Sequence, residues 1–223
     1  MENVNLRLWF NKKGYSKYIS HLDVTRLMQR AFTRADIPIW YTQGFNPHPY
    51  MTFALPLALG CESVCESMDF RVIKDKFTSF SDIKDRLNAI LPKEIQITEV
   101  SEPVNDPKII TCAEYEIYLS DDEFGASKIK SVLDNMLALN EILVMKKTKR
   151  GLSEFNLKPH LNIKETSIKD GEVYIKLKLP AGNILNVNAS LVFDKLGEML
   201  GKKLDYTKVT RVAVLDKDNN FFK

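Results

Sequence analysis

The chain lacks several features that mark whole classes of proteins. It has only three cysteines in 223 residues, an odd number that does not make a disulfide framework and agrees with a reducing compartment. No apolar run approaches the ~18 residues that a membrane span requires, and the N-terminal stretch carries no signal-peptide core. A glycine-rich nucleotide loop, a G-x-S-x-G elbow and an H-E-x-x-H motif are also missing. We therefore expect a cytoplasmic protein without the motifs of the common enzyme classes.

Positive charge is concentrated in two segments, although the formal net charge is only +3. Residues 1–50 hold seven Lys or Arg against three acidic residues, and residues 143–164 hold six against one. The rest of the chain is therefore acidic overall. Such a distribution can present a basic face to phosphates without making the protein strongly basic. The simpler alternative is that both segments are ordinary solvated surface.

Hydrophobic periodicity predicts the order β-α-β-β-α-β twice, and hence an α+β fold of two tandem ferredoxin-like domains with antiparallel sheets. The polar stretch SEPVNDPK suggests a boundary near residue 105, with domains at 1–105 and 106–223. Strands are expected at 4–11, 37–42, 67–73, 94–100, 113–119, 141–147, 172–180 and 206–216, with further extended chain at 53–60 and 158–165. Helices are expected at 21–36, 79–91, 126–139 and 188–200.

The first helix carries a row of arginines. Ser20, with Asp23 three residues later, is a capping pair that predicts its start. Arg26, Arg30 and Arg34 recur every four residues, which aligns them on one face away from the apolar stripe. A line of guanidinium groups without a matching acidic line suits a phosphate backbone.

The stretch TQGFNPHPYM, residues 42–51, has a composition that a packed core does not require. Its two prolines remove backbone donors and push the residues before them toward extended geometry, so we expect a stiff loop leaving the second strand. A stiff loop holds side chains at low entropic cost, and the candidates for nucleotide recognition are Gln43, Asn46, His48 and Tyr50. Alternatively, the loop is a proline-shaped turn with an exposed histidine.

Other candidates for contact with RNA flank these two features. Lys17 lies in GYSKYISHLD before the first helix. The aromatic residues that could stack on unpaired bases are Tyr15, Tyr18, Trp40, Tyr41, Phe45 and Tyr50. Residues 145–161 are expected to form a basic hairpin whose turn carries Gly151. Its cluster of Lys146, Lys147, Lys149 and Arg150 would be relieved of mutual repulsion by an anion. A solvated hairpin tip is the simpler account.

Two histidines are the only candidates for catalysis. His21 and His48 flank the first helix, and histidine is the usual acid or base at neutral pH. A metal-independent ribonuclease could use either, but a histidine near a helix start more often caps or hydrogen-bonds. The chain is therefore expected to be an accessory subunit more readily than an enzyme.

The cysteines form no complete metal motif. CESVCESM, residues 61–68, reads C-x3-C-x2-M, and Met68 replaces the third cysteine of the C-x3-C-x2-C arrangement that holds a radical-SAM iron–sulfur cluster. Cys61 and Cys65 could bind zinc with Cys112 or a histidine, but they lack a paired zinc-ribbon spacing. We expect no metal or cofactor in this chain and interpret the cysteines as small buried hydrophobic residues.

The whole chain resembles a bacterial family, the radical-SAM-linked proteins, which is defined by a domain of unknown function. The resemblance rests on KKGYSKYISHLD, the arginine helix, YTQGFNPHPYMTFALPLALGCES and KKTKRGLSEFNLKPHL. It implies a partner radical-SAM enzyme encoded nearby, which would carry the iron–sulfur cluster and S-adenosylmethionine. A looser similarity to RAMP-superfamily RNA-binding proteins, ribonucleases among them, implies that His21 would act as a general acid or base.

Three hypotheses follow. The leading one is an RNA-binding accessory protein that presents tRNA or rRNA to the radical-SAM enzyme, with no membrane and no DNA expected among its partners. The second is a metal-independent endoribonuclease that uses His21 or His48. The third is a protein adaptor whose loop binds the enzyme.

Overall fold

The computed structural model describes residues 2–148 and 151–223. The chain divides into two compact units, residues 1–110 together with 220–223, and residues 111–219. We expected the boundary near residue 105, and the division falls five residues later. None of the helices in the described part of the chain is long and apolar enough to cross a membrane.

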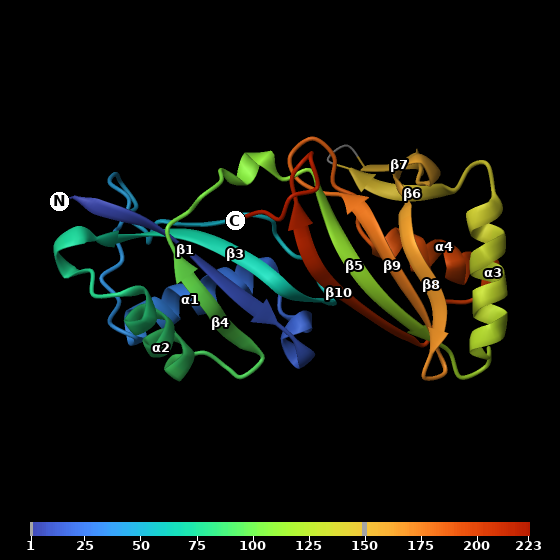
Figure 1. Ribbon diagram of the computed structural model, residues 1–223, viewed down its shortest axis with the longest axis horizontal. Helices are drawn as coiled ribbons and strands as arrows, with labels where there is room; N and C mark the ends of the chain where they lie inside the picture. The colour runs from blue at the N-terminus through green and yellow to red at the C-terminus, as the bar shows by residue number, and fades with distance from the viewer. Residues whose placement is uncertain (1, 149–150) are drawn as a thin grey trace. The chain divides into compact units, whose positions relative to one another are not determined.

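Unit 1 is an antiparallel sheet with two helices packed on one face (Figure 1). Strand β1 pairs with both β3 and β4, and β2 pairs with β3, so the strands run in the order β4-β1-β3-β2. The elements are β1 (Asn3–Lys12), α1 (His21–Arg34), β2 (Met51–Phe53), β3 (Cys61–Ile73), α2 (Phe80–Ile90) and β4 (Ile95–Ser101).

The core of unit 1 lies between that sheet and its helices. Alternate residues of β1, Leu6, Leu8 and Phe10, are fully or almost fully buried, as the period of a strand requires. They pack against Met28 and Phe32 of α1 in one cluster of buried side chains. Core packing therefore decides which face of α1 turns outward.

Unit 2 has the same order of strands, with an additional hairpin (Figure 1). Its antiparallel sheet runs β10-β5-β9-β8, and β6 and β7 form a separate two-stranded sheet. The elements are β5 (Cys112–Ser120), α3 (Ala126–Ala138), β6 (Leu143–Thr148), β7 (Gly151–Asn156), β8 (Asn162–Lys169), β9 (Glu172–Pro180), α4 (Ser190–Leu200) and β10 (Tyr206–Leu215). The α+β class is confirmed, and the assignment of both units to the ferredoxin-like fold stays a prediction.

The second strand of unit 1 was placed wrongly by the sequence pattern. Residues 37–42 form only isolated bridges, and β2 follows the proline-containing loop. Ile39 pairs with Val72 of β3, and after the loop Met51 pairs with the nearby Phe70. Residues 41–50 are therefore an excursion out of a single edge strand. Prolines lack the amide hydrogen that a strand needs, so the chain leaves the sheet there and returns.

The expected strand at 141–147 of unit 2 is also different in the structure. It became β6 of the separate hairpin, and the edge of the main sheet is taken by β8. Val144 and Leu157 are buried, and the Asn156 side chain accepts a hydrogen bond from the Ile142 amide at 3.1 Å. These contacts hold the hairpin in place without a ladder to the main sheet.

The C-terminal segment belongs to unit 1 and anchors a buried arginine. Arg7 Nη1 donates to the Lys223 carbonyl at 2.7 Å, and Phe222 lies 5.8 Å from Trp9 between ring centroids. Arg7 also donates to Asp69 through Nε at 2.6 Å and Nη2 at 2.8 Å. The sequence showed nothing of this long-range arrangement.

Candidate nucleic-acid interface

Helix α1 begins where the capping pair predicts. Ser20 Oγ accepts a hydrogen bond from the Asp23 amide at 3.2 Å and donates one to Asp23 Oδ2 at 2.7 Å. The hydrogen bond to the Ser20 hydroxyl is the main reason that the pKa of Asp23 is lowered. The cap fixes the start of the helix and with it the position of the arginine row.

The three arginines of α1 differ in their partners. All are exposed on the face opposite the core. Arg26 Nη1 lies 3.6 Å from Asp23 Oδ1, so the capping residue Asp23 is also an acidic neighbour of the arginine row. Neither Arg30 nor Arg34 has an ion pair or a side-chain hydrogen bond within residues 2–148 and 151–223. Two guanidinium groups one turn apart are thus left to solvent.

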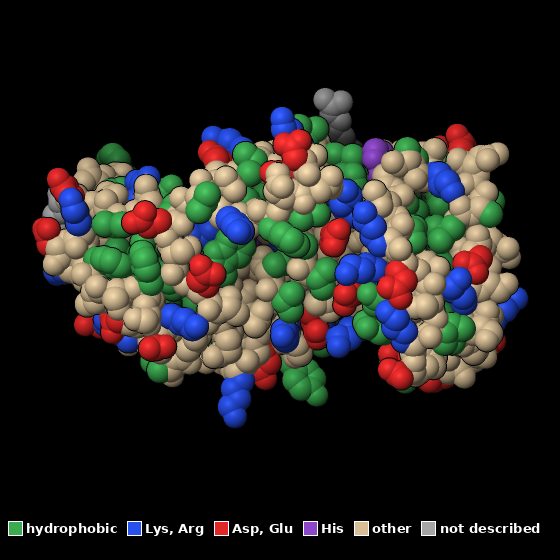
Figure 2. Space-filling view, viewed as in Figure 1, with side chains coloured by type: hydrophobic (Ala, Val, Ile, Leu, Met, Phe, Trp, Pro, Cys, Tyr) green, Lys and Arg blue, Asp and Glu red, His purple; other side chains and the backbone are tan. Residues whose placement is uncertain are grey.

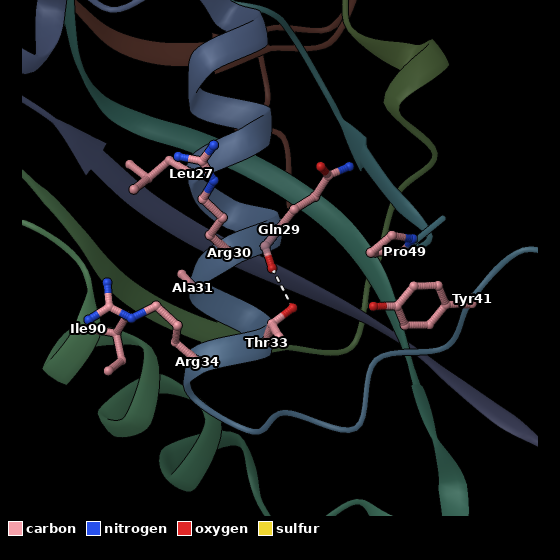
Figure 3. A pocket seen from close by; sticks show the side chains of 9 residues that line it. All are labelled: Leu27, Gln29, Arg30, Ala31, Thr33, Arg34, Tyr41, Pro49 and Ile90. Atoms are coloured by element: carbon pink, nitrogen blue, oxygen red, sulfur yellow. Dashed lines mark hydrogen bonds between the residues drawn. The ribbon is translucent and has the colours of Figure 1, made fainter. Parts of the chain in front are cut away.

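These two arginines line an open pocket of about 500 Å³ (Figure 3). Arg30 and Arg34 lie on one side of the helix beside Leu27 and Ile90, and Gln29, Pro49 and Tyr41 lie on the other. Ile90 comes from the end of α2, and Tyr41 and Pro49 come from the two legs of the loop. The outer surface of α1 is therefore bordered by α2 on one flank and by the loop on the other.

The loop is closed by bonds across its neck. The Thr42 amide donates to the His48 carbonyl at 2.9 Å, and the His48 amide donates to Thr42 Oγ1 at 3.2 Å. His48 Nδ1 lies 3.0 Å from the Asn46 carbonyl and 3.1 Å from Thr42 Oγ1. Gly44 has φ of 139°, a conformation that favours glycine. Nδ1 of His48 thus helps to hold the shape of the loop, and the residue is exposed to solvent.

The four loop candidates do not share one site. Gln43 and Asn46 are exposed, and Phe45 at the tip is fully exposed. Tyr50 is half-buried, and the Arg71 guanidinium carbon lies 4.0 Å from the centre of its ring. Tyr50 lines a different pocket, of about 260 Å³, with Arg71. It therefore supports the base of the loop and does not face α1.

Lys17 lies in a 3₁₀ turn, Gly14–Tyr18, before α1. Its carbonyl accepts from the Gly60 amide at 2.8 Å, and its Nζ lies 5.1 Å from the centre of the Tyr18 ring. It does not line the pocket over α1. The structure thus gives Lys17 a local partner and leaves its expected contact with RNA a prediction.

His21 is an exposed residue at the start of α1, and one part of its ring packs against the protein. Its ring meets Phe53 at 4.8 Å in an edge-to-face arrangement. Burial lowers the pKa of His21, with Lys12 adding to this effect and Glu66 opposing it. The cavity that it lines with these two buried residues is only about 10 Å³, the size of about one water molecule. His21 is suited to accept a proton, but this cavity cannot admit a phosphate.

The basic hairpin is formed, and its two described cations, Lys146 and Lys147, point in different directions. Register places Lys146 opposite Ser153 and Lys147 opposite Leu152, so the two side chains lie on opposite faces. Lys146 Nζ lies 4.7 Å from the centre of the Phe155 ring, which stacks on His160. Gly151 begins β7, and the expected contacts of Lys149 and Arg150 lie outside the described residues. The register therefore does not align Lys146 and Lys147 in a single phosphate-binding row.

The cysteine segment contributes its methionine, and neither of its cysteines, to the core cluster of unit 1. No disulfide joins Cys61, Cys65 or Cys112, and Met68 lies fully buried in the core of unit 1. No group of three or more possible metal ligands occurs in the part of the chain that the structure describes. The buried Met68 packs as a hydrophobic residue and cannot replace the missing thiolate.

Sequence reasoning missed most of the pocket. Gln29, Pro49 and Ile90 were not candidates, and Tyr41 was only one of several aromatic residues. Nothing local marks them, because α1, α2 and the loop meet only in the folded unit. A signal did exist for Gln29, which lies one position before Arg30 on the exposed side of the helical pattern.

Comparison with known proteins gives a family and similarities to solved structures. The crystal structure of a Cbf5-Nop10-Gar1 complex matches 94% of this chain with a TM-score of 0.45 and 12% sequence identity, and the chain spans 48% of the matched one. No curated protein matches. The profile of a bacterial family described as "Uncharacterized protein conserved in bacteria (DUF2344)" matches residues 5–189, so the chain belongs to the DUF2344 family.

Proposed function

We propose that this protein is a cytoplasmic, RNA-binding accessory protein that presents tRNA or rRNA to a partner radical-SAM enzyme. One observation carries the RNA-binding part: Arg30 and Arg34, both without an ion-pair partner among the described residues, border a pocket whose other side is an exposed aromatic ring. Guanidinium groups bind phosphate oxygens in pairs of hydrogen bonds, and exposed rings stack on bases.

Stability does not explain these arginines. An exposed cation without a partner contributes little to folding, and two cations one helical turn apart repel each other. An anion bound between them would relieve that repulsion. Lys147 on the hairpin is a further exposed cation without an ion-pair partner in residues 2–148 and 151–223, and it would add to the attraction for a polyanion.

The partner enzyme enters the proposal from the resemblance of the sequence. A radical-SAM enzyme would supply the iron–sulfur cluster and S-adenosylmethionine. The core position of Met68 supports this division, because Cys61 and Cys65 alone would hold a cluster badly.

Titration with RNA tests the proposal. Labelled total tRNA and rRNA fragments are titrated with the protein at several salt concentrations, and binding that weakens steeply with salt is expected. The double variant R30Q/R34Q should bind about tenfold or more weakly. K128Q is the matched control, because Lys128 is an exposed cation on α3 of unit 2. Absence of salt-dependent binding to any RNA would sink the proposal.

A ribonuclease is the second candidate, and the lowered pKa of His21 favours it because a neutral imidazole can accept a proton. RNA incubated in EDTA with wild type, H21A and H48A should be cleaved only where the catalytic histidine is present. Intact RNA in the wild-type lane would exclude this activity.

A protein adaptor is the third candidate, and the fully exposed Phe45 at the loop tip favours it. F45A should then abolish co-purification with the radical-SAM enzyme and leave RNA binding unchanged. Retained co-purification would argue against the loop as the docking element.

A further inference from the structure

The wall of the α1 pocket that carries Tyr41 is preformed. Both legs of the loop are anchored at neighbouring positions of β3. The Trp40 amide donates to the Arg71 carbonyl at 2.8 Å, and Met51 pairs with Phe70. The Tyr50 amide then donates to the Trp40 carbonyl at 3.0 Å and closes the excursion at its base.

Arg71 fastens this base from the side of β3. Its guanidinium carbon lies 4.0 Å from the Tyr50 ring centre and 5.4 Å from that of Trp40. Its Nε donates to Asn5 Oδ1 at 2.7 Å, which fixes the plane of the group. Above the base, Tyr41 and Pro49 face each other in a β-bridge. The backbone of Tyr41 is thus held in place before any ligand arrives, so little backbone entropy is lost on binding.

The pocket over α1 is open and has a flank on each side, which bears on the shape of nucleic acid that it accepts. A helix that reads a duplex enters a groove of the nucleic acid and must therefore protrude from the surrounding protein surface. The outer surface of α1 instead lies between Ile90 on one flank and Tyr41 and Pro49 on the other (Figure 3). A flexible single strand can bend to contact both flanks, whereas a duplex is too stiff to bend over so short a distance.

The chemistry of the two flanks matches the two parts of a nucleotide. Arg30 and Arg34 offer donors to phosphate oxygens on one side. On the other side Tyr41 is 46% exposed and offers a ring face beside the apolar surface of Pro49. Gln29 adds an amide that can donate to and accept from a base edge.

We infer that this pocket takes an unpaired nucleotide of single-stranded RNA, with phosphates on Arg30 and Arg34 and the base stacked on Tyr41. The inference rests on the proposed RNA binding and adds the class of RNA. The strand crosses α1 from the arginine flank to the loop flank.

Fluorescence anisotropy with the full chain tests it. A labelled 12-nucleotide RNA is titrated alone and annealed to its complement, in the same buffer. We expect the single strand to bind at least about tenfold more tightly than the duplex, since a stacked base contributes that much or more. Y41L should weaken single-strand binding by about the same factor and leave duplex binding unchanged, and Y41F should bind like wild type.

The control variant is Y206L, because Tyr206 is a similarly exposed tyrosine on β10 of unit 2. Equal or tighter binding of the duplex, or an effect of Y41L no larger than that of Y206L, would overturn the inference and leave the proposed RNA binding intact. Binding of neither RNA would overturn both. Melting temperatures of all variants show whether a lost affinity comes from lost folding.

Discussion

The two sides of unit 1 use arginine for opposite purposes. Arg7, on the sheet, is 1% exposed and its guanidinium bonds Asp69, the Asn105 carbonyl and the Lys223 carbonyl. Arg30 and Arg34, on the outer surface of α1, are exposed and have no such partner in the described residues. A buried charge must be satisfied inside the protein, whereas an exposed charge can wait for a ligand. The same type of side chain therefore stabilises the fold at position 7 and remains accessible to a ligand at positions 30 and 34.

The largest expected effect comes from the buried side of this comparison. R7A removes the ion-pair partner of Asp69 and the two hydrogen bonds that Arg7 donates to backbone carbonyls. We therefore expect a loss of about 3–5 kcal/mol in the free energy of unfolding. Urea denaturation measures it. R30A is the control, and it should change stability by no more than about 0.5 kcal/mol. Similar losses in the two variants would contradict the contrast drawn between them.

Binding should show the reverse ranking among the arginines. R30Q and R34Q should each lower the slope of log affinity against log salt by about 0.7 for single-stranded RNA. R26Q should lower it less, because Arg26 already lies 3.6 Å from Asp23. Titrations at four salt concentrations measure the slopes. Equal slopes for the three variants would show that the ion pair with Asp23 does not matter.

A smaller effect is expected at the cap that sets the arginine row. S20A removes the acceptor for the Asp23 amide and should cost about 1 kcal/mol of stability. It should also let the pKa of Asp23 rise toward its usual value, because the hydrogen bond from the Ser20 hydroxyl is lost. S20N, which keeps a side-chain acceptor, is the matched control. Carboxyl titration by NMR and urea denaturation check both outcomes, and S20N should resemble wild type in stability.

The smallest effect is a pH dependence at His21. Burial lowers the pKa of its imidazole in the folded state, so the unfolded chain binds the proton more tightly. The stability contributed by neutral His21 is full above the unfolded value of about 6.5 and is lost as the pH falls through the lower folded pKa. H21Q should therefore flatten the stability profile on the acid side of that value. An unchanged slope between wild type and H21Q would show that His21 does not titrate differently on folding.

Local features of the fold could be predicted from the sequence. The start of α1 follows from Ser20 and Asp23, and its exposed arginine face follows from the helical period. The strand at Leu6, Leu8 and Phe10 follows from alternation. Each of these signals lies within one element, so neighbours in the sequence are enough to reveal it.

Features that depend on distant partners could not be predicted. β2 was placed at 37–42 because IPIWYT looks like a strand, yet pairing with β3 resumes only at Met51, after the prolines. The 141–147 segment has strand character, but only tertiary contacts direct it into a hairpin with β7. In both cases the residue pattern is compatible with a strand but does not specify which strand it pairs with.

The sequence by itself determined that α1 exposes arginines and that residues 42–50 form a non-helical loop, because capping, periodicity and proline chemistry act over a few residues. Only the tertiary structure decided that the loop is an excursion from one edge strand and that Tyr41 faces the helix with Arg30 and Arg34. It also decided that Arg7 is buried against the C-terminal segment. The reason is that pairing on a sheet edge and burial of charge depend on residues far apart in the chain, which meet only when the core of unit 1 forms.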